Sequence, residues 1–324
     1  MTYRFKLQEP VGAGVRRIAL EQIEIADEKL ASQRDIATCI HDARRCLKRL
    51  KALMRLVRPA LDDDVYRREA ARLSGVGRLL SSERDQHVIR QTVTKLENRF
   101  GALPNGASQR LKELLQVQAA SLLGSEMAES RRQALSRLKQ TRRFFSGAGI
   151  AGVRFDHLAD GLERSYRKAR RAFRTAYDEP ADEAFHAWRK SVQLHWRHMQ
   201  LLSRGWPEML TARAGEAKEL SRLLGDDHDF AVLLTYVTNH AGEDFSPDDQ
   251  AVLSSLCRSC QAELRASAKP RGKRLLAESA TSLRDKIELY WEAACRLSAL
   301  AAAKEQEEKP EPKADLKRVR RGSR

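Results

Sequence analysis

The chain has 324 residues, and its 60 Lys and Arg outnumber its 44 Asp and Glu, which leaves a formal net charge of +16 at pH 7. Hydrophobic residues make up 42% and charged residues 32%, with only 17 Gly and 9 Pro, so the composition argues against a loop-rich β fold and predicts an all-α protein. The positive excess predicts attraction of anions, but leaves open whether the anion is a nucleic acid, a membrane surface or polyphosphate.

The first residues predict a lead-in rather than a helix. Residues 3–7 alternate in polarity, which predicts a brief edge strand ahead of the turn residues Pro10, Gly12 and Gly14. From Arg16 onward, apolar residues recur with helical spacing in about eight long helices. Breaks between these helices are predicted near Pro59 and at residues 101–106, 146–152, 178–180, 205–207, 242–247 and 269–272.

Residues 41–58 predict a helix with one wholly cationic face. Steps of three and four residues place six basic side chains on this face: His41, Arg44, Lys48, Lys51, Arg55 and Arg58. The face is about 25 Å long at the usual helical rise, and no acidic residue lies between Asp42 and Asp62. Because like charges at this spacing repel, a partner with repeated negative charge would relieve them. A neighbouring apolar face is predicted to pack inward and to fix the direction of the stripe: Leu47, Leu50, Leu53, Met54 and Val57.

The glycine-rich stretch at residues 146–152 is the best candidate for an internal boundary, because clustered glycines weaken a helix most. Residues before it recur after it at a nearly constant offset. Arg78, Leu79, Leu80, Asp85, Val88 and Ile89 recur as Arg222, Leu223, Leu224, Asp229, Val232 and Leu233, and His41 and Arg44 recur as His186 and Arg189. The repeat indicates an ancient duplication. We therefore expect one helical bundle over residues 1–146, a second over residues 153–300, and a disordered tail over residues 301–324, which has too little apolar content to pack.

Two further basic stripes follow this boundary. The helix predicted over residues 156–177 carries one of them: Arg164, Arg167, Arg171 and Arg174. The helix that follows Pro180 carries the other: His186, Arg189, Lys190 and Arg197. A single stripe is usually a solvated helix face, but ordinary solvated helices mix Glu with Lys, so three stripes favour a binding surface.

Two histidines, His41 and His186, open equivalent stripes. A histidine among arginines has its protonation suppressed until an anion binds, after which it can donate a hydrogen bond. The alternative interpretation is a structural histidine at a helix junction, and both interpretations stay open from the sequence. His195 is different, because it falls on the apolar face of its helix with Trp188 and is predicted to be buried.

Short motifs do not indicate an enzyme or a metal site. The chain has no P-loop, nucleophile elbow or His-Glu-x-x-His sequence. Residues 305–309 match the Glu-x-Glu-x-Lys signature of tunnel triphosphatases, but that signature needs a β-barrel strand, and this copy lies in a proline-flanked tail. Cys257 and Cys260 are predicted to lie in an apolar seam, and Asp226 and Asp227 in a turn and helix cap. We therefore predict no catalytic residue, no metal and no cofactor.

No apolar stretch approaches the roughly 20 residues that a membrane helix needs, so no integral membrane association is expected. The 5 Cys lack the spacing of a disulfide framework, and the first residues contain no apolar run like that of a signal peptide. These features predict a reducing, cytoplasmic location.

Several motifs of the chain occur together in one known family. They are Gly14-Val15-Arg16-Arg17-Ile18, His41-Asp42-Ala43-Arg44 with Lys48, Arg49 and Lys51, Glu83-Arg84-Asp85 with Val88, Phe185-His186-Ala187-Trp188-Arg189-Lys190, and Lys218-Glu219-Leu220-Ser221 followed by Leu224-Gly225-Asp226-Asp227-His228-Asp229. Over roughly residues 3–300 the chain thus resembles the CHAD family, the conserved histidine α-helical domain. The chain departs from the family's pattern at two positions. Gln193 stands where the family commonly has a basic residue, and His228 takes the place in the second half that corresponds to Arg84 in the first half.

The resemblance implies two pseudo-symmetric four-helix bundles around a central basic channel. It also implies non-catalytic binding of inorganic polyphosphate and, in some members, association with polyphosphate granules. Together with the stripes it predicts these polyphosphate-binding residues: Arg17, His41, Arg44, Lys48, Arg49, Lys51, Arg55, Arg164, Arg167, Arg171, His186, Arg189, Lys190, Arg197 and Lys218.

The second hypothesis is a nucleic-acid-binding helical protein, since the same cations would hold the phosphates of DNA or RNA. Base stacking would require exposed aromatic side chains among the cations. Aromatic residues make up only 6% of the chain, and its four Trp residues mostly lie in apolar sequence surroundings. Inorganic polyphosphate is therefore the first choice of partner.

Overall fold

The computed structural model describes residues 3–80, 82–101, 106, 109–115, 124–240, 242 and 244–307, with side chains described for all of these except residues 82–87, 124–126 and 305–307. This part of the chain is almost entirely helical and contains no β-strand, which confirms the all-α prediction. No helix within it combines the length and the apolarity needed to cross a membrane.

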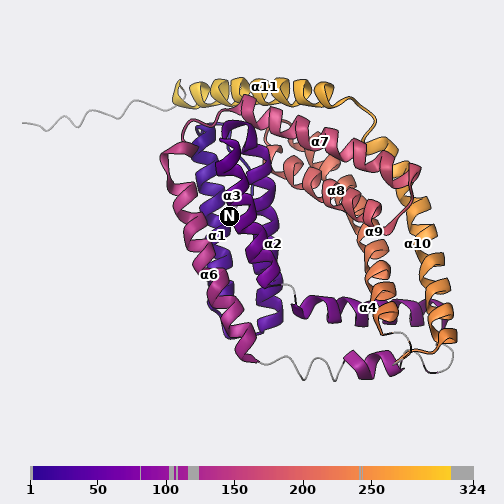
Figure 1. Ribbon diagram of the computed structural model, residues 1–324. Helices are drawn as coiled ribbons and strands as arrows, with labels where there is room; N and C mark the ends of the chain where they lie inside the picture. Colours follow the sequence, from indigo (N-terminus) through magenta and orange to yellow (C-terminus); the bar gives the residue numbers. More distant parts are fainter. Residues whose placement is uncertain are drawn as a thin grey trace, which may run out of the picture.

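Four helices of the first half stand side by side (Figure 1). α1 (Val11–Ala31) packs on α2 (Ile36–Val57) and on α6 (Gly124–Ser146), and α3 (Asp63–Leu79) packs on the same two helices. Side chains cap the N-termini of two of these helices. Asp35 accepts a hydrogen bond from the Thr38 N–H at 3.2 Å at the start of α2, and Asp62 accepts one from the Asp64 N–H at 2.9 Å at the start of α3. The predicted break near Pro59 is confirmed, because α2 ends in the short 3-10 helix η1 (Arg58–Ala60).

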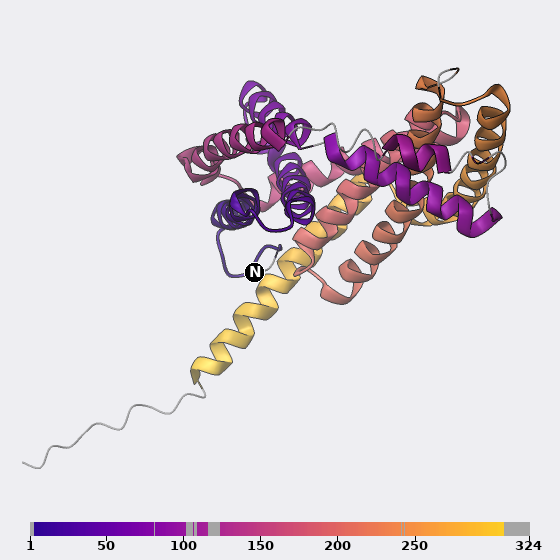
Figure 2. The same cartoon turned by 90° about the horizontal axis from the view of Figure 1, so that it is seen from below.

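The helices of the second half pack in chain order. α7 (Phe155–Asp178), α8 (Asp182–Leu202), α9 (Pro207–Asn239) and α10 (Pro247–Leu275) each contact the next, and α11 (Ala280–Glu307) lies across α7 (Figure 1). The predicted breaks at residues 146–152, 178–180, 205–207 and 242–247 are confirmed, the first of them holding the 3-10 helix η3 (Ala148–Ile150). Figure 2 shows α11 extending beyond the other helices, into the first residues of the predicted tail.

The two halves share one large core. α2 packs on both α7 and α8, and Leu53 and Leu56 belong to the same buried cluster as Leu158 and Leu162. Gly161 lies directly against the backbone carbonyl of Leu56, where an added Cβ would overlap the oxygen. Only glycine therefore allows α7 to approach α2 this closely. This packing holds the basic faces of α2, α7 and α8 near one another.

α4 (Ser82–Phe100) comes from the first half of the sequence but packs on the second half. It lies across the ends of α9 and α10 (Figure 1) and contacts α9. A second buried cluster joins α4 to these helices and includes Ile89, Val93, Leu96, Phe230, Leu233, Leu253, Cys257 and Cys260. The predicted apolar seam around the two cysteines is confirmed.

Two local predictions are wrong because tertiary packing overrides the local pattern. Residues 3–7 form bends and turns instead of a strand, since the buried Phe5 anchors them to α8 through its N–H, which donates to the Leu201 carbonyl at 2.9 Å. α9 continues without a turn through Asp226 and Asp227, so neither caps a helix. Apolar residues on both sides of this acidic stretch are buried and keep the helix continuous.

The break predicted at residues 269–272 is also wrong, because α10 runs through it and includes Pro270. Gly272 lies under the rings of Trp188 and Phe173, where an added Cβ would come within 2.7 Å of ring carbons. The glycine thus serves a close approach of α10 to α7 and α8 rather than a helix end.

Candidate functional site

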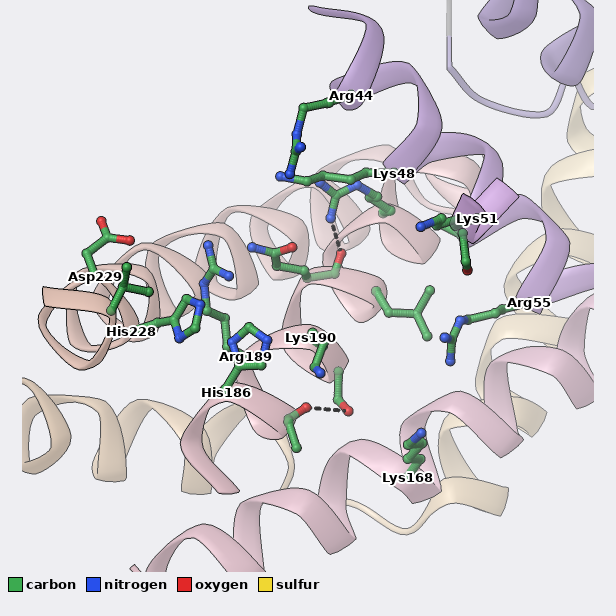
Figure 3. A pocket seen from close by; sticks show the side chains of 18 of the residues that line it. Arg44, Lys48, Lys51, Arg55, Lys168, His186, Arg189, Lys190, His228 and Asp229 are labelled. Atoms are coloured by element: carbon green, nitrogen blue, oxygen red, sulfur yellow. Dashed lines mark hydrogen bonds between the residues drawn. The ribbon is translucent and has the colours of Figure 1, made fainter. Parts of the chain in front are cut away.

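Side chains of α2, α7, α8 and α9 line a cleft of about 540 Å³, which we call the basic cleft (Figure 3). Its lining contains eight Lys and Arg residues: Arg44, Lys48, Lys51, Arg55, Lys168, Arg189, Lys190 and Arg197. The one carboxylate in its described lining is Asp229, which lies 3.7 Å from the Lys95 ammonium group. The lining is therefore strongly positive.

α2 forms one wall of the basic cleft. Its apolar face, from Leu47 to Val57, is buried in the large core, which aims the cationic face at α7 and α8 as predicted (Figure 3). Burial lowers the pKa of Lys51, and the neighbouring positive charges of Arg55 and Arg44 lower it further. The wall therefore holds cations close enough to destabilise one another.

Arg197 of α8 is a buried cation in this lining, with only 7% of the residue exposed. Its Nη1 donates to the Gln193 carbonyl at 2.7 Å, and no described carboxylate forms an ion pair with it. Burial lowers the pKa of Arg197 to about 10, Tyr3 acts in the opposite direction, and the charges of Arg49 and Arg189 lower it further. The group stays charged at neutral pH, so an anion in the cleft would stabilise it.

Two histidine rings stack at one end of the basic cleft. The ring centroids of His186 and His228 lie 3.8 Å apart, and both residues also line a second cleft of about 350 Å³, which we call the histidine cleft. Burial lowers the pKa of His186 to about 4, with further lowering by Lys190 and Arg189. The sequence predicted suppression by neighbouring cations, whereas burial is the larger cause in the structure. The buried Nδ1 of His186 has no hydrogen-bond partner among the described residues.

A third cleft of about 500 Å³, the arginine groove, lies between α7 and α8. Its described lining is Arg164, Arg167, Lys168, Arg171, Ala172, Thr175, Ala184 and Ala187. It shares Lys168 and Ala187 with the basic cleft, so the two clefts adjoin at these residues. The arginine stripe of α7 therefore adjoins the stripes of α2 and α8.

The structure brings together eleven of the predicted residues and separates four. Those that line the basic cleft are Arg44, Lys48, Lys51, Arg55, His186, Arg189, Lys190 and Arg197, and those that line the arginine groove are Arg164, Arg167 and Arg171. The four that line none of these three clefts are Arg17, His41, Arg49 and Lys218.

Two of the four have structural contacts in the first half of the chain. Arg17 donates to Glu9 at 3.0 Å and to the Arg4 carbonyl at 3.0 Å, which ties the lead-in to α1. Arg49 donates to the Gln22 side chain at 3.1 Å and lies over the Tyr3 ring. Their charges are directed into the fold rather than into the clefts.

The other two are exposed. The His41 side chain is 73% exposed, with its Nδ1 3.9 Å from the Asp42 carboxylate, so its surroundings differ from those of the half-buried His186. Lys218 is exposed on α9. The motif Glu83-Arg84-Asp85 lies outside the residues whose side chains are described.

Sequence reasoning missed Lys168 and His228. Lys168 follows Arg164 by four residues, so helical spacing could have found it on the α7 stripe. His228 had only its place in a family motif as a signal, because its pairing with His186 depends on the packing of α8 on α9. His195, predicted to be buried, is confirmed in the core, where its Nε2 accepts the Arg213 Nε–H at 3.0 Å.

No group of three or more His, Cys, Asp and Glu side chains is placed to hold a metal ion in the described part of the chain. The family model of the CHAD domain matches residues 16–238, from α1 almost to the end of α9. This range contains every described residue that lines the basic cleft and the arginine groove. A search of curated proteins finds no match.

Proposed function

The chain belongs to the CHAD domain family, and from this premise we propose that its basic cleft binds inorganic polyphosphate without catalysing a reaction. The observation that carries the proposal is the convergence of eight Lys and Arg side chains from three helices around one described carboxylate. These cations repel one another, and the depressed pKa values of Lys51, Lys168 and Arg197 are consequences of burial and of that repulsion. A bound polyanion would relieve the repulsion.

The kind of polyanion follows from what accompanies the cations. Binding of single-stranded nucleic acid relies on base stacking against exposed aromatic rings. Apart from the two histidines, no described residue that lines the basic cleft is aromatic, and Trp188 is fully buried in the core. Trp206 is exposed, but it lies against Tyr290 of α11, outside the clefts. A polymer of phosphate without bases matches this lining better, and nucleic acid remains the second choice.

A non-catalytic role fits the scarcity of carboxylates. Metal-assisted phosphoryl transfer needs carboxylates that hold metal ions beside the phosphates. Asp229 is the one carboxylate in the described lining, and Lys95 already lies beside it. We therefore assign the cleft to binding rather than to hydrolysis.

The family membership extends the proposal to architecture and location. We propose that the two halves descend from one duplicated unit and form two pseudo-symmetric four-helix bundles around a central basic channel. The mutual packing of α1, α2, α3 and α6, and the serial packing of α7 to α10, support this arrangement. Binding along the polymer would also retain the protein at polyphosphate granules.

Isothermal titration calorimetry with polyphosphate at two salt concentrations tests the proposal. We expect strong binding that weakens steeply with salt, because screening weakens interactions between exposed charges. Charge-assisted hydrogen bonds contribute about 1.5–3 kcal/mol each, so the double variant Arg44→Glu/Arg189→Glu should bind at least about a hundredfold more weakly. Its helical circular-dichroism signal should be unchanged.

The matched control is the double variant Arg45→Glu/Arg143→Glu, which makes the same change in net charge at two exposed sites outside the clefts. This control should keep most of the affinity. Equal loss of affinity in both double variants would show that net charge alone explains the binding, and it would refute the basic cleft as the binding site. Duplex DNA that displaces polyphosphate at equal phosphate concentration would favour the nucleic-acid alternative instead.

A further inference from the structure

Positive charge is continuous where the basic cleft meets the arginine groove. Lys168 belongs to both linings and lies within the electrostatic influence of Arg55 from α2 and Lys190 from α8. Figure 3 shows Lys168 on α7, across the cleft from the α2 side chains. An anion that leaves the basic cleft at this point therefore meets no interruption in positive charge.

The arginine groove is built to admit a narrow chain. Arg164, Arg167 and Arg171 recur along α7 over about 10 Å at the usual rise per residue. The side chains between α7 and α8 are small: Ala172, Thr175, Ala184 and Ala187. Large residues at these positions would fill the groove, whereas these leave it open beside a row of cations.

Two of the three arginines of the groove are available to a ligand. Arg164 and Arg171 are exposed and form no ion pair or hydrogen bond with any residue that the structure describes. Arg167 pairs with Glu163, one turn earlier on the same helix. No described residue that lines the groove is acidic.

The opposite end of the basic cleft offers a less favourable continuation. The histidine cleft has two acidic residues in its described lining and no Lys or Arg. Asp182 pairs with Arg258 and Arg265, which lie outside this lining, so Glu183 is the carboxylate there without a described ion pair. A phosphate chain too long for the basic cleft would gain attraction along α7, whereas in the other direction it would meet the Glu183 carboxylate and no cation of the described lining.

We propose that the arginine groove is a second polyphosphate subsite, which extends the basic cleft along α7 and makes binding depend on the length of the chain. A short polyphosphate binds in the basic cleft alone, while a long one also occupies the groove. This inference rests on the proposed function of the basic cleft and adds to it a basis for discrimination by length.

The test compares the triple variant Arg164→Gln/Arg167→Gln/Arg171→Gln with the unmodified chain. Each is titrated calorimetrically with tripolyphosphate and with long-chain polyphosphate at low salt. Exposed ion pairs are individually worth up to a few-fold in affinity, so the triple variant should bind the long chain on the order of tenfold more weakly. Its affinity for tripolyphosphate should stay within about twofold of the original, because that ligand does not reach the groove.

A control triple variant, Arg67→Gln/Arg132→Gln/Arg143→Gln, removes the same charge from exposed positions on α3 and α6. It should leave both affinities nearly unchanged, and circular dichroism should show all three proteins equally helical. Three results would each refute the groove as a subsite. They are an equal loss of affinity for short and long chains in the triple variant, no loss for either ligand, and an equal loss in the control variant. If the unmodified chain binds neither ligand, the proposed function of the basic cleft fails as well, which separates the two conclusions.

Discussion

Replacing the buried Arg197 by Met should stabilise the free protein and weaken its binding of polyphosphate. Arg197 is a charged group in a nearly buried position beside other cations. Met has a similar length and is apolar, so Arg197→Met removes the charge without opening a large cavity.

The size of the effect follows from the electrostatics of the folded state. The pKa of Arg197 is lowered from 12.5 to about 10, and each pKa unit corresponds to about 1.4 kcal/mol, so the charged form is disfavoured by about 3 kcal/mol. Its hydrogen bond to the Gln193 carbonyl offsets about 1 kcal/mol of this. We therefore expect Arg197→Met to raise the free energy of unfolding by about 2 kcal/mol.

Urea denaturation, followed by circular dichroism with and without polyphosphate, measures both effects. A ligand at a hundred times its Kd adds about 2.7 kcal/mol to the stability of a protein that binds it only when folded. The unmodified chain should show this gain, and Arg197→Met should show a smaller one. The variant is thus expected to be more stable than the original without ligand, and to lose that advantage when ligand is present.

Arg131 provides a matched control, because it is buried to the same extent as Arg197 but its guanidinium donates hydrogen bonds to backbone carbonyls of another helix end. It is 8% exposed, and its guanidinium donates to the Leu30 carbonyl at 2.9 Å and also to the Ser32 carbonyl at the end of α1. Arg131→Met should lower the free energy of unfolding by about 1–3 kcal/mol, since buried carbonyls lose their donors. If Arg197→Met is destabilising to the same degree, the charge of Arg197 is already compensated in the free protein and the reasoning fails.

Three further predictions concern packing, pH and the cleft. Gly161→Ala should lower the free energy of unfolding by about 1–3 kcal/mol, because the added Cβ overlaps the Leu56 carbonyl. Gly215→Ala, in open space on α9, should raise the free energy of unfolding by about 0.5–1 kcal/mol. Urea titrations of the two variants should therefore show shifts of the midpoint in opposite directions. Stability should fall as the pH drops from 6.5 toward 4. Burial lowers the pKa of His198 to about 4 and also lowers the pKa of His195, so in this range the unfolded chain binds protons that the folded chain does not. A denaturation midpoint that is unchanged between pH 7 and 4.5 would contradict this prediction. Gln193→Arg should strengthen polyphosphate binding several-fold by adding a cation to the lining of the basic cleft, and a calorimetric Kd that stays the same or rises would oppose it.

The local features of the site were predictable because they depend on neighbours along one helix. Helical periodicity placed Arg44, Lys48, Lys51 and Arg55 on one face of α2, and the buried face beside them fixed its direction. Most helix ends followed from Pro and Gly for the same local reason. The same spacing places Lys168, four residues after Arg164, on the α7 stripe.

Contacts between distant segments were not predictable from spacing. α10 passes through Pro270 because Gly272 fits against two rings from other helices, and α4 packs on helices of the opposite half. His41 and His186 occupy matching places in the sequence, yet one is exposed beside Asp42 and the other is stacked on His228.

The sequence by itself determined that this is a basic helical chain and which side of each helix carries the cations, since a repeat of 3.6 residues per turn is a property of one helix. Only the tertiary structure decided that the rows on α2, α7 and α8 meet, because the distance and rotation between helices depend on contacts such as that of Gly161 with the Leu56 carbonyl. Such contacts join residues far apart in the chain, and no local pattern encodes them.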